Sequence, residues 1–257
     1  MRPFGWPIKE TVVIKGVEIH PRVKNERDVL KRFQNKTSGL QPIVDEIEDP
    51  PQTTTARARP LNRKGLRFVS LCILDALNGL HEGGYYLKPD NILCVISDVR
   101  LGDLGGTCHI DSKGATSGTP LGAPMWRSPE MIMETPWGTP TDIWSYGTVL
   151  VSLIYGGDFN LFDPVTVPYG HEEYSMEILK QQFRYFGPWP GKYEKVASPE
   201  TLQAIRWIMQ EIPKSETTQC AMITENEVCN KNMAFIMEIM KFDWRDRPSA
   251  RKLLVGS

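Results

Sequence analysis

Two short segments, LKPDNIL at residues 87–93 and LGDLGG at residues 101–106, carry the most specific pattern in the chain. Either segment alone is a modest signal, because lysine, asparagine and aspartate are common in loops. The spacing between them is more informative. It places Lys88, Asn91 and Asp103 where a catalytic loop and a metal-binding Asp-x-Gly turn would lie.

The order of motifs resembles that of the eukaryotic protein kinase family. LKPDNIL is similar to the end of that family's catalytic loop, and Asp103-Leu104-Gly105 is similar to its DFG turn. Ser128-Pro129-Glu130 resembles the APE triplet that ends the activation segment. The stretch DIWSYG at residues 142–147 resembles the start of the large buried helix. Arg247 resembles the late arginine that pairs with the APE glutamate.

The resemblance extends over roughly residues 11–255 and is weaker before residue 69. Upstream, the strand VVIK at residues 12–15 supplies Lys15, and Glu26 is the best candidate for the glutamate that pairs with it. The stretch GAPMWRSPE, followed by WGTPTDIWSYG, is most similar to fungal serine/threonine kinase-like proteins near the SR-protein kinase group.

The resemblance implies ATP and Mg²⁺ as cofactors and gives each site residue a role. Lys15 would hold the α- and β-phosphates while Glu26 fixes its position. Lys88 would place an ammonium group near the transferred phosphoryl group, since phosphoryl transfer depends on positioning and charge neutralisation. Asn91 and Asp103 would hold Mg²⁺, which prefers oxygen ligands.

One expected residue is missing, namely the aspartate of the family's H-R-D triplet, which should precede Leu87. This chain has Gly84-Tyr85-Tyr86 there, and the segment is about three residues short, so the base position is either Tyr86 or deleted. A tyrosine with an ordinary pKa near ~10 cannot replace a carboxylate as the proton acceptor. Asp90 is close in sequence, but we expect it to point elsewhere.

The nucleotide-binding half also departs from the family pattern. Only 14 residues precede Lys15, too few for a glycine-rich loop with its two strands, and no G-x-G-x-x-G is present. The stretch QTTTARARPLNRKG at residues 52–65 lacks the apolar alternation of a strand and replaces the expected hinge. We therefore expect an α+β, protein-kinase-like fold with a residual N-lobe at 1–52, a shortened hinge or linker at 53–65 and a helical C-lobe at 66–257.

Hydrophobic periodicity predicts the main elements. Residues 11–19 are rich in β-branched side chains and predict a strand. Residues 22–35 predict an amphipathic helix, and 139–155 predict a helix that is apolar on most faces and therefore buried. Further helices are predicted at 66–82, 171–186, 199–211 and 231–241.

Composition bounds the class of protein. The 257 residues carry a net charge of −1 and are 40% hydrophobic, as in an ordinary globular protein. The five cysteines are an odd number without a CxxC pair, which favours a reducing compartment. The start, MRPFGWPIKE, has no apolar h-region, and the longest mainly apolar stretch, residues 148–155, is too short to span a bilayer, so we expect neither a secretory signal nor a membrane span. We therefore expect an intracellular, cytoplasmic or nuclear protein without membrane contact.

Two functions of different classes follow, and a third is weaker. The first is a serine/threonine kinase homologue with impaired or absent phosphotransfer that binds a protein partner as a scaffold. The second is an active ATP-dependent kinase, acting on a protein substrate, whose natural chain has segments missing from this sequence. The third is a nucleic-acid-binding module using the basic run at 57–67, which the near-zero charge disfavours. Oligomeric state is not indicated.

Overall fold

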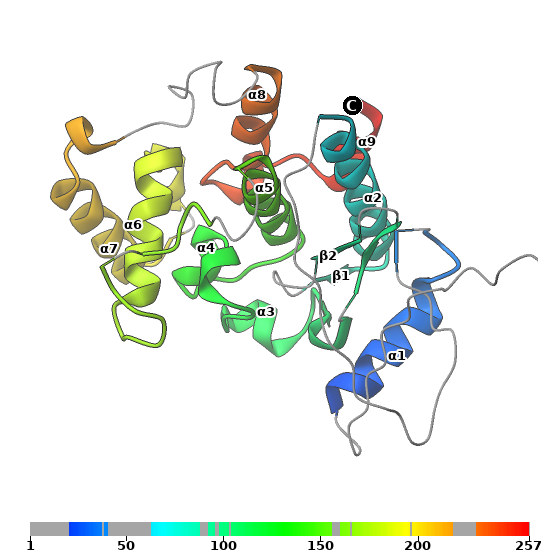
Figure 1. Cartoon of the computed structure of the whole chain (residues 1–257). Coiled ribbons are helices and arrows are strands. Elements are labelled where there is room, and N and C mark those ends of the chain that lie inside the picture. The colour runs from blue at the N-terminus through cyan, green and yellow to red at the C-terminus, as the bar shows by residue number, and fades with distance from the viewer. Residues whose placement is uncertain are drawn as a thin grey trace, which may run out of the picture.

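The computed structural model describes most of the chain from Pro21 onward, and it is mainly helical (Figure 1). The described residues are 21–37, 39–40, 63–87, 92–95, 98–102, 104–155, 160–164, 166–195, 197–217 and 230–256. The α-helices are α1 (Pro21–Phe33), α2 (Arg63–Glu82), α3 (Lys113–Ser117), α4 (Pro129–Ile132), α5 (Pro140–Tyr155), α6 (Tyr174–Phe186), α7 (Pro199–Glu211), α8 (Asn230–Ile239) and α9 (Ala250–Gly256).

The strands and 3₁₀ turns are short. The strands are β1 (Tyr85–Tyr86), β2 (Ile92–Val95), β3 (Asp98–Leu101) and β4 (Cys108–His109). The 3₁₀ turns include η1 (Leu104–Gly106), η2 (Pro124–Trp126), η3 (Gly191–Lys195), η4 (Lys214–Glu216) and η6 (Trp244–Asp246).

The helices predicted from periodicity are confirmed by α1, α2, α5, α6, α7 and α8. Helix α2 begins at Arg63, slightly before the expected start, and ends before Gly83-Gly84 as predicted. Gly84 has φ +75, a left-handed conformation that glycine adopts readily. The strand predicted at 11–19 and most of the linker at 53–65 lie outside the described residues.

Two antiparallel ladders connect the loops of the helical lobe. Strand β2 pairs with β3 as a hairpin, and β1 pairs with β4 in the register Tyr85 with His109 and Tyr86 with Cys108. The second ladder joins the chain just before the LKPDNIL loop to the chain just after the LGDLGG turn. The residues that flank the two predicted landmarks are therefore paired with each other.

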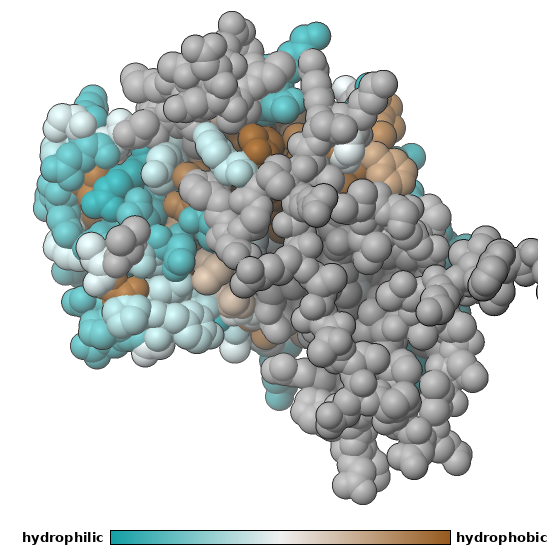
Figure 2. Space-filling view, viewed as in Figure 1, coloured by the Kyte–Doolittle hydropathy of each residue, from teal (hydrophilic) through white to brown (hydrophobic). Residues whose placement is uncertain are grey.

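Helix α5 is the buried central helix that its composition predicts. Figure 1 shows it between α6 on one side and α2 with α9 on the other. Trp144 of α5 is fully buried, and its ring packs against Phe162, Phe186 and Phe242 with centroids 5.7–5.9 Å apart. Aromatic groups of this size contribute strongly to a core. By contrast, Figure 2 shows a mostly hydrophilic surface over α6 and α7.

The end of α1 and the chain just after it pack closely on glycines at and just beyond the end of α2. A Cβ at Gly83 would lie 2.4 Å from the Phe33 ring, and one at Gly79 would lie 2.9 Å from the Thr37 side chain. Phe33 is fully buried. The only N-terminal helix that the described residues include is thus seated directly on the helical lobe.

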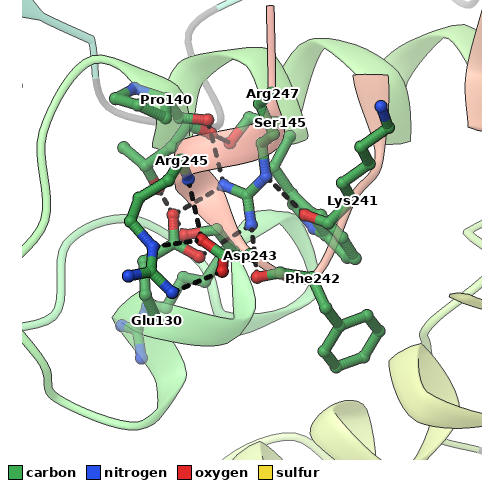
Figure 3. A network of polar contacts seen from close by, with 12 residues as sticks. Glu130, Pro140, Ser145, Lys241, Phe242, Asp243, Arg245 and Arg247 are labelled. Carbon is green, nitrogen blue, oxygen red and sulfur yellow. Dashed lines mark hydrogen bonds and ion pairs between the residues drawn. The ribbon is translucent and has the colours of Figure 1, made fainter. Parts of the chain in front are cut away.

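A buried ion pair joins the end of the activation segment to the C-terminal part of the chain (Figure 3). The guanidinium of Arg247 donates to both carboxylate oxygens of Glu130, at 2.6 and 2.8 Å. It also donates to the carbonyl oxygens of Lys241, Pro140 and Phe242. Both side chains are almost fully buried, so each charge depends on the other.

We predict that Arg247→Ala lowers the free energy of unfolding by about 3–5 kcal/mol, because it leaves the Glu130 carboxylate buried without its partner. Urea unfolding measures this loss. Arg206→Ala is the control, since Arg206 pairs with Glu194 at 3.8 Å on the surface and should cost less than about 1 kcal/mol. Equal losses in the two variants would contradict the prediction.

Candidate active site

The site is organised around the buried carboxylate of Asp142, near the start of α5. Its two oxygens accept the backbone N–H of Leu87 at 3.1 and 3.0 Å. His81, near the end of α2, lies 2.8 Å away through Nε2. Burial raises the pKa of Asp142, while the hydrogen bonds from His81 and Leu87 act in the opposite direction. Helix α2, helix α5 and the residue that follows β1 therefore meet at one carboxyl group.

Tyr86, the residue predicted at or beside the base position, is fully buried in strand β1. Its ring meets Trp137 edge to face at 4.3 Å between centroids, and its hydroxyl lies 3.3 Å from Ser112 Oγ. Burial raises the pKa of the Tyr86 phenol further above its ordinary value of 10. The phenol is therefore neutral at physiological pH and is a poor proton acceptor.

Helix α1 contacts the Asp-x-Gly turn through two adjacent polar side chains. Glu26 Oε1 accepts the backbone N–H of Leu104 at 3.2 Å, and Leu104 directly follows Asp103. Asn25 Nδ2 donates to the carbonyl oxygens of Gly105 and Thr107, at 3.2 and 2.9 Å. The predicted glutamate thus reaches the predicted metal-binding turn.

The other predicted site residues, Lys15, Lys88, Asn91 and Asp103, lie outside the described residues. Their roles, and the pairing of Lys15 with Glu26, stay predictions. Among the residues that the structure describes, no three His, Cys, Asp or Glu side chains group as a metal site. The expected Mg²⁺ ligands Asn91 and Asp103 are not among those residues.

Sequence reasoning gave no role to Asn25, His81 or Trp137. Asn25 directly precedes the predicted glutamate, Glu26, and this proximity is the sequence feature that could indicate its role. His81 is a single histidine near the end of a predicted helix, a position that carries no functional signal in the sequence. Trp137 carried no signal, because its contact with Tyr86 joins residues that are distant in the sequence.

A model of the protein kinase domain matches residues 8–256, nearly the whole chain. The chain belongs to the protein kinase domain family. Protein kinase domains in general use ATP and Mg²⁺ and act on proteins. Membership therefore agrees with the order of motifs that the sequence carries.

Serine/threonine kinases are among the similar curated proteins. The shk1/pak1 kinase of Schizosaccharomyces pombe is 34% identical over 166 residues, which cover 57% of this chain and 25% of that protein. STE20 of Saccharomyces cerevisiae is 30% identical over 155 residues, covering 58% and 16%. Rat PAK 5 is 30% identical over 119 residues, covering 44% and 16%. The match spans a quarter or less of each of these relatives. The predicted place near the SR-protein kinases stays a prediction.

A solved structure confirms the kinase-like fold. In the crystal structure of the yeast RNA Pol II CTD kinase CTDK-1 complex, one chain aligns with a TM-score of 0.65 at 18% identity. The alignment covers 93% of this chain and 80% of that chain. At this identity the likeness concerns the fold alone.

In the part of the chain that the structure describes, no helix is long and apolar enough to cross a membrane.

We predict that Asp142→Ala destabilises the protein more than Asp142→Asn does. Alanine leaves the buried Leu87 N–H without an acceptor, at a cost of about 1–3 kcal/mol for that group. Asparagine keeps one acceptor oxygen. Urea unfolding of both variants tests this order, and equal stabilities would show that the Leu87 contact is unimportant.

We also predict that Asn25→Ala loosens the η1 turn. The variant loses two hydrogen bonds to η1 and Thr107, at a cost of about 1–2 kcal/mol, and exchange of the Thr107 amide should quicken. Arg27→Ala is a suitable control on the same helix, because Arg27 hydrogen-bonds only its neighbour Asp28 among the bonds described. Unchanged Thr107 exchange in Asn25→Ala would refute this role.

Proposed function

We propose that this kinase-family chain has impaired or absent phosphotransfer and acts by binding a protein partner through its helical lobe, as a scaffold. The observation that carries the proposal is the environment of Tyr86. At or beside the position of the catalytic aspartate stands a buried phenol in contact with Trp137. No carboxylate lies in that stretch between Gly83 and Leu87.

The short connection from α2 supports the proposal. The Leu87 amide is already bonded to Asp142, and Tyr86 is already paired with Cys108. In the sequence, Tyr86 of strand β1 is followed directly by Leu87 of LKPDNIL, and no H-R-D triplet precedes it. Without that aspartate, a substrate hydroxyl has no base to accept its proton.

Nucleotide binding is a separate question from chemistry. As the family resemblance implies, Lys15 and Lys88 would contact ATP, Glu26 would fix the position of Lys15, and Asn91 with Asp103 would hold Mg²⁺. Glu26 lies beside the Asp-x-Gly turn, a position compatible with its proposed role near the nucleotide site.

The division into a residual N-lobe at 1–52, a linker at 53–65 and a C-lobe at 66–257 belongs to the same proposal. So does an intracellular location.

The alternative is an active ATP-dependent serine/threonine kinase whose natural chain contains further segments. It is supported by the similarity of this chain to proteins that are named serine/threonine-protein kinases. The two proposed functions require different sequences in two regions. An active chain needs an H-x-D between Gly84 and Leu87 and a longer N-lobe, and the full transcript would contain both.

A phosphotransfer assay on the purified chain with Mg-ATP and a generic protein substrate tests the proposal. We expect the wild-type chain to show no transfer above background, because the proton acceptor is missing. The Asp103→Asn variant should therefore give the same background level as the wild type. The shk1/pak1 kinase is a positive control for the assay. Turnover that Asp103→Asn abolishes would overturn the proposal. A thermal shift with Mg-ATP, measured in parallel, tests nucleotide binding independently of turnover.

A further inference from the structure

The two tyrosines of strand β1 face opposite parts of the molecule. Successive side chains of a strand point to opposite sides. Tyr86 points into a small buried cluster with Ala115, Met131 and Trp137, apart from the main core. Tyr85 points to helix α1, where its ring meets that of Phe33 edge to face at 5.3 Å between centroids.

The activation segment, defined here as residues 104–130, packs against the Tyr86 side of the strand. Ser112 Oγ, which lies 3.3 Å from the Tyr86 hydroxyl, also caps helix α3 by accepting the Ala115 N–H. Ala115 is buried in the same cluster. The first turn of α3 is therefore seated directly on Tyr86.

Trp137 closes this cluster from the opposite side. Its indole Nε1 donates to the Thr119 carbonyl at 3.1 Å, and its backbone N–H donates to the Ala115 carbonyl at 3.1 Å. Between these points, Gly118 has φ +77, and a Cβ there would lie 2.1 Å from the Glu134 carbonyl oxygen. The chain from Ser112 to Thr119 is thus fixed at its start, middle and end.

The Tyr85 side of the strand holds helix α1. Arg32 donates to the Tyr85 hydroxyl at 3.0 Å, and its guanidinium lies 5.2 Å from the centre of the Tyr85 ring. On its other side, the Tyr85 ring meets His109 of strand β4 at 5.3 Å. One two-residue strand therefore contacts both α1 and the activation segment.

We propose that β1 is a two-sided clamp in which Tyr86 keeps residues 112–119 folded and Tyr85 keeps α1 in place, so that the activation segment is ordered without nucleotide and without phosphorylation. All the contacts that support the clamp are aromatic, apolar or neutral hydrogen bonds within the chain, apart from the Arg32 contact to Tyr85. The proposal is independent of whether the chain transfers phosphate.

Amide hydrogen exchange on the full unphosphorylated chain, without nucleotide, tests the clamp. In Tyr86→Ala, the amides of Thr116, Thr119 and Trp137 should exchange at least about tenfold faster, because a large buried ring is lost. The amides of α1 and α5 should keep their wild-type rates. In Tyr85→Ala, the amides of α1 should exchange faster while those of residues 112–119 do not.

Two further variants guard against general unfolding. Tyr86→Phe keeps the ring and loses only the hydrogen bonds of the hydroxyl with Ser112 and Cys108, so exchange should stay within a few-fold of wild type. Trp137→Phe keeps a ring but loses the indole bond to Thr119, so the Thr119 region should open without β1 being altered. Unchanged exchange at residues 112–119 in Tyr86→Ala would overturn the clamp. So would an equal increase in α5, which would indicate a merely structural role.

Discussion

The buried carboxyl group of Asp142 is the constraint on which the arrangement of the site depends. A polar or charged group in the interior is costly unless it is hydrogen-bonded. Helix α5 carries this group into the core, where it receives the Leu87 amide and lies against His81. The Leu87 amide at the end of β1 therefore has one favourable position, beside the Asp142 carboxyl group. The positions of β1 and of its paired strand β4 follow from that contact.

Two further contacts extend this constraint across the lobe. The ladder between β1 and β4 fixes the chain that follows the Asp-x-Gly turn. The ion pair of Glu130 with Arg247 fixes the other end of the activation segment. The segment between them is anchored at both ends, and Trp137 contacts its middle. Helix α1 then rests on the turn itself through Asn25 and Glu26.

The parts that sequence could predict are those with a repeating pattern or a fixed motif. Helices α2 and α5 follow from apolar residues at helical spacing, and the pairing of Glu130 with Arg247 follows from the family landmarks. The ladder between β1 and β4 could not be predicted, since a two-residue strand has no periodicity. The direction of Tyr86 was equally hidden, because Trp137 reaches it from distant sequence. Lys15, Lys88, Asn91 and Asp103 stay predictions.

The surroundings of Tyr86 connect the chemistry of the site to its stability. A carboxyl group that acts as a general base must be ionised near neutral pH, and water, hydrogen-bond donors or a nearby cation favour that form. The cluster of Ala115, Met131 and Trp137 supplies neither, and it favours a neutral aromatic ring. The same lack of polarity gives the activation segment an apolar surface to pack against. A carboxylate at this position would lose that packing and carry a desolvation cost, so the features that disfavour a base here are those that keep the segment folded.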